Sequence, residues 1–335
     1  MALREGKKTI LIEKDIRILS AASIVSKKEG EGPLRDYFDV INNDMYFGEE
    51  SWEKAESILQ KNTAELAIKK ASLTEREIDI CLSGDLLNQC IGSAYGLRGL
   101  SVPFLGLYGA CSTFSEGLGL ASVLIDSGAI LKSLNLTSSH FCSSERQFRF
   151  PLEYGGIRPP SSQWTVTGSG AVILGEGKAG PRIKRVLFGE IQDLGITDIN
   201  NMGAAMAPAA ADTIAAFFED TGTAPSDYDL IATGDLGSIG STLLYRLLDE
   251  KGIDITSVHS DCGLLIFDTK RQDVHAGGSG CGCSASVFCS YIYNKMLSGK
   301  LKRVLLIATG ALMSPTATNQ KESIPSVAHL VEIVG

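Results

Sequence analysis

The sequence predicts a layered α/β fold built from two similar halves, and three observations support this prediction. Hydrophobic residues make up 44% of the 335 residues, charged residues make up 21%, and 36 residues are glycine. This balance is typical of a globular α/β protein with a large core and many tight turns. Segments with helical spacing alternate with short apolar strands. The same order of segments recurs about 150 residues further along the chain, which indicates a duplication.

The first copy of this pattern is a helix followed by a strand. Residues 63–71 have the apolar spacing of a helix. Thr74 and Glu77 then have the spacing of a capping box. The apolar run 78–82 predicts a buried strand, which ends at the turn Gly84-Asp85-Leu86.

The second copy repeats this order. Residues 213–218 predict a helix, and the apolar run 228–232 predicts a strand that ends at the turn Gly234-Asp235-Leu236. The two turns have the same Gly-Asp-Leu sequence and follow equivalent strands. We therefore expect them to occupy equivalent places in the two halves.

Two cysteine-serine pairs strengthen the duplication. Cys111-Ser112 opens an apolar helix that leads into a strand at residues 134–138, and Cys283-Ser284 opens another that leads into a strand at 304–309. Residues 172–175 add a further strand to the first half. The offset between these pairs is about 172 residues, so the second half carries an insertion. We divide the chain into residues 1–178 and 179–335.

Composition also excludes several classes of function. The formal charge is −8, and no basic cluster is longer than two lysines, which argues against a nucleic-acid partner. The charged N-terminal segment 1–8 is unlike a signal peptide, and no apolar stretch predicts a membrane span. We therefore expect the protein to be in the reducing cytosol, where its eight cysteines would be free thiols rather than disulfides.

Cys111 is the candidate nucleophile. It lies in Gly109-Ala110-Cys111-Ser112-Thr113, just before the predicted helix. The free N–H groups and the positive dipole at a helix N-terminus favour a thiolate. The alternative is that Cys111 is a small buried residue that lets a helix approach a sheet.

Two of the four histidines could act as its acid/base partner. His275 is the better candidate, because it precedes the glycine-rich turn Gly277-Gly278-Ser279-Gly280, which could present an imidazole to a pocket. His259 is the second candidate. Either histidine could instead be a hydrogen-bonded core residue.

Metal and nucleotide sites are not predicted. Cys281-Gly282-Cys283, with Cys262 and Cys289 nearby in sequence, lacks the usual Cys-x₂-Cys spacing of zinc sites. The duplication explains Cys283 more simply, as the equivalent of Cys111. The glycine-rich segments lack the lysine and the spacing of phosphate-binding loops.

Between the halves, Arg146, Arg149 and Arg158 alternate with aromatic residues. Guanidinium groups pair with carboxylates and stack on aromatic rings, so this segment could clamp an anionic ring compound. An ordinary solvated or dimer-facing loop is the alternative.

These motifs resemble the thiolase and β-ketoacyl synthase superfamily over nearly the whole chain. The most specific stretches are the Cys111 motif, residues 153–168 and residues 274–281. The resemblance implies a thiolase-like duplicated fold, with a mixed five-stranded sheet in each half and an αβαβα order of layers. Cys111 matches the nucleophile of the enzymes and His275 matches the histidine before the glycine-rich turn. Asp235, however, stands where the enzymes have a histidine or asparagine, and an ionised carboxylate would oppose an oxyanion.

Within the superfamily, the chain is similar to sporulation proteins of spore-forming Firmicutes that bind dipicolinic acid (pyridine-2,6-dicarboxylate). The resemblance implies that this acid, with calcium, binds beneath Cys111 for uptake into spores and later release. The ligand-binding residues expected are Cys111, His275, His259, Asp235, Arg149 and Arg158. No cofactor is expected apart from calcium arriving with the ligand, for which Asp235 and Asp261 could supply oxygen ligands.

The resemblance also implies a homodimer, membrane-protein partners from the same sporulation operon, and a position peripheral to the inner spore membrane. Two other functions stay open. The chain could be an acyltransferase or β-ketoacyl synthase with an acylated Cys111, using His275 and His259 as catalytic partners. It could also be a scaffold with a vestigial pocket.

Overall fold

The computed structural model describes residues 2–148 and 157–335. Ten strands in this part of the chain follow one another in the order β12-β11-β14-β15-β10-β3-β9-β7-β5-β6. The strands of the first half are β3 (Ile16–Ser26), β5 (Ile80–Gly84), β6 (Phe104–Gly106), β7 (Lys132–Ser139) and β9 (Gly168–Glu176). Those of the second half are β10 (Arg182–Phe188), β11 (Leu230–Thr233), β12 (His259–Asp261), β14 (Arg303–Ala311) and β15 (Ser326–Val334).

The two sets of five strands have the same arrangement. In the first half, β5 is parallel to β6 and β7, whereas β9 is antiparallel to β7 and β3. In the second half, β11 is parallel to β12 and β14, whereas β15 is antiparallel to β14 and β10. The sets meet at one residue pair, Arg17 and Arg182. Each half therefore has a mixed five-stranded sheet, as predicted.

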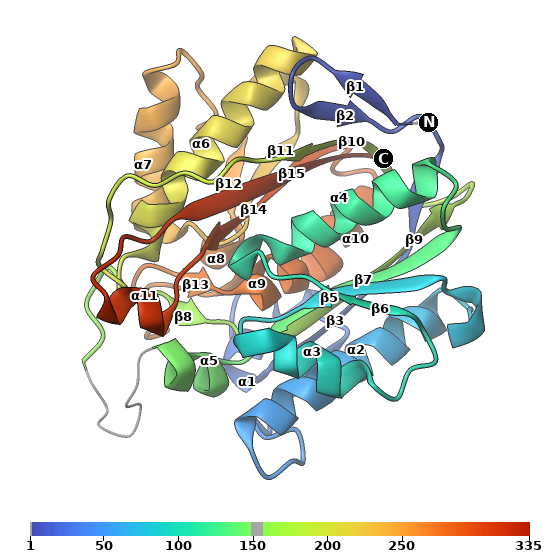
Figure 1. The fold of residues 1–335 in the computed structure, drawn as a ribbon, viewed down its shortest axis with the longest axis horizontal. Helices are drawn as coiled ribbons and strands as arrows, with labels where there is room; N and C mark the ends of the chain where they lie inside the picture. The colour runs from blue at the N-terminus through green and yellow to red at the C-terminus, as the bar shows by residue number, and fades with distance from the viewer. Residues whose placement is uncertain (1, 149–156) are drawn as a thin grey trace.

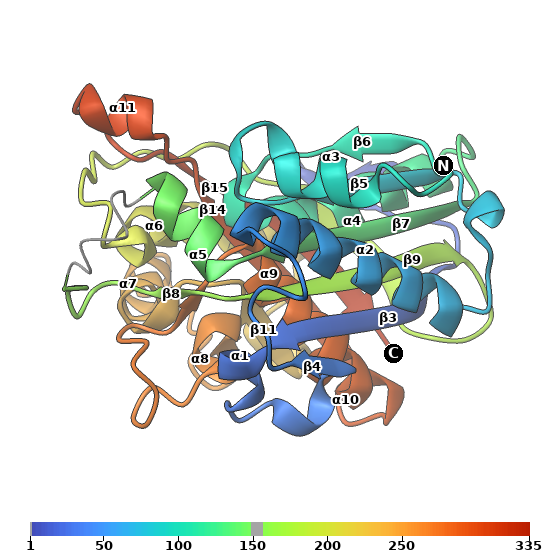
Figure 2. The same ribbon diagram turned by 90° about the horizontal axis from the view of Figure 1, so that it is seen from below.

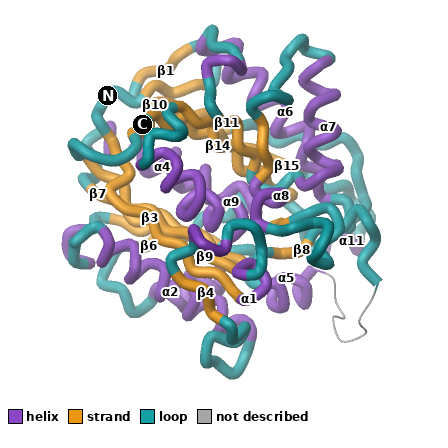
Figure 3. Tube along the Cα trace, turned by 180° about the vertical axis from the view of Figure 1, so that it is seen from behind, coloured by secondary structure: helices purple, strands orange, loops and turns teal. Residues whose placement is uncertain are grey.

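Helices cover both outer faces and fill the space between the halves (Figures 1 and 3). On one outer face lie α6 (Met202–Thr221) and α7 (Gly237–Asp249), and on the other lie α2 (Trp52–Lys70) and α3 (Ile91–Leu97). Between the sheets lie α4 (Thr113–Asp126) and the helix formed by α9 (Cys281–Val287), a π-helical turn (Phe288–Ile292) and α10 (Tyr293–Leu297). The αβαβα order of layers is thereby confirmed.

The remaining elements are short. They are the strands β1 (Leu3–Glu5), β2 (Thr9–Leu11), β4 (Val40–Asn42), β8 (Trp164–Thr165) and β13 (Gly278–Ser279), and the helices α1 (Lys27–Gly30), α5 (Phe141–Phe148), α8 (Cys262–Ile266) and α11 (Pro315–Asn319). Strands β8 and β13 pair with each other and thus join the two halves near the site described below.

The central core explains why the two halves form one body. Its apolar side chains come from both sheets and from the helices between them, for example Leu118, Leu174, Phe288, Leu306 and Val331, each of which is fully buried or nearly so. Burial of apolar surface is the main stabilising contribution to folding. The two halves therefore share the largest part of their core.

Most of the predicted elements are present, with shifted boundaries. The capping box is confirmed, because the backbone N–H and the hydroxyl of Thr74 both donate to the Glu77 carboxylate, at 2.8 and 2.9 Å. The helix expected at Cys283 begins at Cys281. The long strands β3, β10 and β15 were not predicted.

Candidate functional site

Cys111 lies in a 3₁₀ turn, Ala110–Ser112, that leads directly into α4. Hydroxyl groups hold this turn. Ser112 donates to the carbonyl of Gly109 at 2.7 Å, and Thr113 donates to the carbonyl of Ala110 at 2.7 Å. The backbone φ of Ala110 is +50°. Residues other than glycine rarely adopt this conformation, and they do so mainly where the surrounding structure enforces it.

The turn is pressed against the second half of the protein. A Cβ atom added to Gly310 on β14 would lie 2.1 Å from the carbonyl oxygen of Gly109, so only glycine fits there. Cys111 is 5% exposed. The fold therefore places this cysteine at the boundary between the halves.

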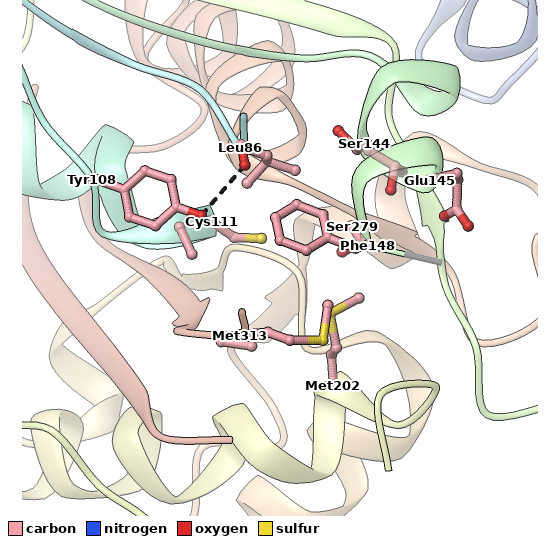
Figure 4. Close-up of a pocket in the computed structure, with 12 residues that line it drawn as sticks. Leu86, Tyr108, Cys111, Ser144, Glu145, Phe148, Met202, Ser279 and Met313 are labelled. Atoms are coloured by element: carbon pink, nitrogen blue, oxygen red, sulfur yellow. Dashed lines mark hydrogen bonds between the residues drawn. The ribbon is translucent and has the colours of Figure 1, made fainter. Parts of the chain in front are cut away.

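A small pocket opens beside Cys111 (Figure 4). Its cavity volume is about 40 Å³, which is room for about one water molecule. Apolar, hydroxyl and thiol groups dominate its walls. The lining residues are Leu86, Tyr108, Ala110, Cys111, Ser144, Glu145, Phe148, Thr165, Met202, Ser279, Ala311 and Met313. No lysine, arginine or histidine is present among these described residues.

Asp235 lies beside Cys111, close enough for its charge to act on the thiol. Asp235 is fully buried in the turn after β11. One carboxylate oxygen accepts from the Thr309 hydroxyl at 2.9 Å, and the other accepts from the Gly280 N–H at 2.9 Å. Gly280 has a φ of +104°, a value that favours glycine and that aims its N–H at the carboxylate.

This environment determines the protonation of both groups. Burial raises the pKa of Asp235 to about 7, although the hydrogen bonds from Gly280 and Thr309 oppose this rise. Burial and the neighbouring Asp235 raise the pKa of Cys111 well above its usual value. The thiolate expected from the helix N-terminus is thus corrected to a neutral thiol, because desolvation outweighs the helix end.

His259 supports the Asp235 turn and does not line the pocket. Its two ring nitrogens lie 2.9 Å from the Thr233 hydroxyl and 2.8 Å from the Tyr245 hydroxyl. Thr233 donates its only proton to Asp261 at 2.6 Å, so Nε2 of His259 must donate to Thr233 and Nδ1 must accept from Tyr245. Burial lowers the pKa of His259 to about 4, which keeps the ring neutral.

Asp261 also has a structural role, because it accepts hydrogen bonds from backbone N–H groups. Its carboxylate accepts from the N–H groups of Leu236 and Gly237, at 2.8 and 3.0 Å, at the start of α7. Asp261 does not line the pocket. It fixes the turn that carries Asp235.

The other predicted residues lie elsewhere. His275 is partly exposed, and its Nε2 is 3.4 Å from the Asp273 carboxylate. Arg158 pairs with the same carboxylate at 3.0 Å and lies over the Trp164 ring. Arg149 lies outside the described residues. Of the candidate ligand-binding residues that are described, only Cys111 and Asp235 are brought together.

Arg146, the third arginine of the segment, is also engaged with other groups. It forms an ion pair with Glu53 and lies over the Trp52 ring.

Sequence reasoning missed the wall of the pocket formed by α5, which contributes Ser144, Glu145 and Phe148. It also missed Met202, which opens α6, and Met313, which follows β14. These residues carry no motif. The only available signal was that α5 follows β7 directly, at the same edge of the sheet as Cys111.

The duplicated fold and the buried cysteine between its halves define a thiolase-like protein. Solved structures of OleA from Xanthomonas campestris share this fold. One OleA variant matches with a TM-score of 0.63 at 15% identity, covering 97% of this chain and 99% of OleA. OleA with bound cerulenin matches with a TM-score of 0.62 at 14% identity, covering 97% and 100%.

The sequence comparisons are more specific than the fold. The chain belongs to the stage V sporulation protein AD family, whose model matches residues 6–334. Stage V sporulation protein AD of Bacillus subtilis (strain 168) is 47% identical over 324 residues, which cover 97% of this chain and 96% of that protein. Within the described ranges, no helix has the length and apolar character needed to cross a membrane.

Proposed function

We propose that this protein binds dipicolinic acid, together with calcium, in the pocket beside Cys111, and that it serves uptake of the acid into spores and its later release. Membership of a sporulation family supports the biological setting. The observation that carries a binding role is the buried position of Cys111 beside the Asp235 carboxyl group. Burial and this neighbouring acid both disfavour the thiolate that acyl transfer needs, so the thiol suits recognition better than catalysis.

The chemistry of the walls favours a ligand without net charge. Dipicolinate is a dianion, yet the described lining offers no cationic side chain and includes Glu145, with Asp235 beside Cys111. A calcium ion would neutralise the ligand and would prefer oxygen ligands from carboxylates and hydroxyl groups. Ser279 and Thr165 supply hydroxyl groups in the lining.

The pocket must widen to admit this ligand. A cavity of about 40 Å³ is far below the size of typical ligand pockets, about 300 Å³ and above. Phe148, Met202 and Met313 line it with flexible or large apolar side chains (Figure 4). Movement of these side chains, or of α5 as a unit, would create the space.

The binding role can be tested against the acyltransferase alternative with one pair of variants. Calorimetry with dipicolinate, with and without calcium, should give about tenfold weaker binding for Cys111→Ala, or about 1.4 kcal/mol. Cys283→Ala, the same change at the equivalent position in the second half, is the matched control and should bind normally. Intact-mass measurements after incubation with acetyl or malonyl thioesters should find no adduct on Cys111. An acyl adduct that Cys111→Ala abolishes would favour the enzyme instead.

We further propose that the protein is a homodimer that pairs through β6. This strand is the free edge of the first half (Figure 2). It exposes Phe104 and Leu105, and exposed apolar edges tend to pair with another chain. Nearby Tyr108 is 43% exposed and also lines the pocket, so a partner copy on this edge would lie close to the site.

The proposed cellular setting follows from the family alone. We propose that the protein acts with membrane proteins of the same sporulation operon and lies peripheral to the inner spore membrane. Co-purification of those proteins with the tagged chain from sporulating cells, and its loss when the operon is deleted, would test this.

A further inference from the structure

Two carboxylic acids face each other inside the first half, away from Cys111. Glu56 on α2 and Asp85 after β5 are both fully buried. A Cβ atom added to Gly92 on α3 would lie 3.1 Å from the carboxyl carbon of Asp85 and 3.4 Å from that of Glu56. Both carboxyl groups therefore lie within 3.4 Å of one point above Gly92, where a larger residue would crowd them.

Neutral groups hold both acids. Glu56 accepts from the hydroxyls of Ser138 and Ser143, at 2.9 and 2.8 Å. Asp85 accepts from the hydroxyl and the N–H of Ser93, at 2.6 and 2.7 Å. The Gln60 amide donates to Ser93 and Ser138, at 2.9 and 2.8 Å, and so joins the two acids in one network.

The network contains no cation to balance two negative charges. Two buried carboxylates this close cannot both be ionised without a large cost, and one retained proton removes that cost. Accordingly, burial and the charge of Asp85 raise the pKa of Glu56 to about 8. Burial also raises the pKa of Asp85.

The surrounding titratable groups do not supply the missing charge. Glu53 on α2 adds a negative charge, and it forms an ion pair with Arg146 of α5. The other groups are weak acids whose pKa values burial raises, so they are neutral near pH 7. They are Cys90, Tyr108, Cys111 and Cys281.

This network also holds one wall of the pocket. Ser143, which donates to Glu56, lies on α5, the helix that carries Ser144, Glu145 and Phe148 into the pocket. Gln147 of the same helix is bound to the loop after Asp85, because it donates to the Leu86 carbonyl at 3.2 Å and accepts from the Asn88 N–H at 2.9 Å. Glu56 is therefore hydrogen-bonded directly to α5, and Asp85 is connected to α5 through the short loop that follows it.

We propose that Glu56 and Asp85 form a proton-binding site that controls the Cys111 pocket. Release of the proton that the pair retains leaves two like charges close together, and their repulsion separates α2 from the loop after Asp85. Because α5 bridges these two segments through Ser143 and Gln147, it loosens and the pocket widens. The inference concerns the protein without ligand, so it stands or falls independently of dipicolinate binding. The direction of the pH effect follows from the pair. Because folding raises the pKa of Glu56, its stabilising contribution is complete below about pH 4.5 and is lost as the pH rises to about 8.

The two tryptophans of the chain are natural reporters of α5. Arg146 lies over the Trp52 ring, 4.9 Å from its centroid, and Phe141 stacks on Trp164 with ring centroids 3.7 Å apart. Arg146 and Phe141 both belong to α5. A change in the seating of this helix should therefore change tryptophan emission.

The experiment is a titration of tryptophan emission in the ligand-free protein, from about pH 6 to about pH 9.5, around the pKa of the pair. The wild type should show a transition near pH 8. Glu56→Gln and Asp85→Asn retain hydrogen-bonding groups but remove the shared proton, and each should abolish the transition. Asp126→Asn, at a buried carboxyl group that accepts from the Lys14 N–H, is the control and should retain it.

Two further readouts decide the outcome. The difference between the infrared spectra of the wild type and Glu56→Gln should show a protonated carboxyl band that disappears over the same pH range. Taking the difference removes the band of Asp235, whose pKa of about 7 is common to both proteins. Hydrogen exchange in residues 141–148, corrected for base catalysis, should accelerate above the transition in the wild type alone. A wild type without a transition, or a Glu56→Gln protein that titrates and exchanges like the wild type, would overturn the proposal.

Discussion

The Cys111 thiol lies beside the Asp235 carboxyl group across the boundary between the two halves. Cys111 comes from the turn before α4, and Asp235 comes from the turn after β11. Each half therefore contributes one member of the pair. The pair also couples two titrations, because the charge on one group determines the pKa of the other.

Replacing Asp235 with asparagine should make Cys111 more reactive. Asp235→Asn keeps the size of the side chain but removes the negative charge that raises the pKa of Cys111. A fall of one pKa unit would speed alkylation by iodoacetamide about tenfold at neutral pH. The measurement is the pH dependence of alkylation followed by mass spectrometry at Cys111. Asp126→Asn serves as a control, and an Asp235→Asn profile that overlays the wild type would contradict the coupling.

His259 should matter for stability rather than for chemistry. His259→Gln removes a ring that bridges Thr233 and Tyr245, so we expect a loss of about 1–2 kcal/mol at pH 7 in urea unfolding. Because folding lowers the pKa of His259 to about 4, its contribution is present above about pH 6.5 and is lost as the pH falls. The variant should therefore lose less stability than the wild type between pH 7 and pH 5. Equal losses in the two proteins would count against this assignment.

The sequence suggested that Arg146, Arg149 and Arg158 could bind the anionic ligand, and the contacts of two of them in the structure change this expectation. Arg146 and Arg158 already pair with Glu53 and Asp273, and neither lines the pocket. We expect Arg146→Ala and Arg158→Ala to change the affinity for calcium dipicolinate by less than about threefold. Arg149→Ala, at a position outside the described residues, tests whether this segment supplies charge at all. A tenfold loss of affinity in Arg158→Ala would indicate that Arg158 does contribute to the binding site.

The β6 edge predicts the oligomeric state. The wild type should have the mass of a dimer by light scattering at micromolar concentration, and Leu105→Glu should give a monomer because it places a charge on an apolar pairing edge. Leu297→Glu, at another exposed leucine, is the control, because α10 ends on the opposite side of the molecule from β6 (Figure 2). A monomeric wild type would contradict the proposed dimer. A dimeric Leu105→Glu protein would show that the interface does not involve β6.

Much of the fold could be predicted because its signals are local. Helical spacing, the Thr74–Glu77 capping box and the apolar strand runs each depend on neighbouring residues, and the duplication made them more reliable. Cys111 was selected for the same reason, because it directly precedes a predicted helix, and the turn that carries Asp235 was recognised because it repeats in both halves. The strand β3 was missed because a strand buried on both faces lacks the alternation that distinguishes a strand.

The sequence by itself determined the duplicated architecture, the position of Cys111 before a helix, and the position of Asp235 in a turn that repeats in both halves. Only the tertiary structure decided which side chains share a pocket. It directs His275 toward Asp273 and His259 toward Thr233, and it brings α5 to the pocket. The physical reason is that burial and long-range contacts determine both geometry and protonation. From the sequence, the position of Cys111 at a helix N-terminus predicted a thiolate. In the structure, burial and the neighbouring Asp235 raise the pKa of Cys111 and keep its thiol protonated.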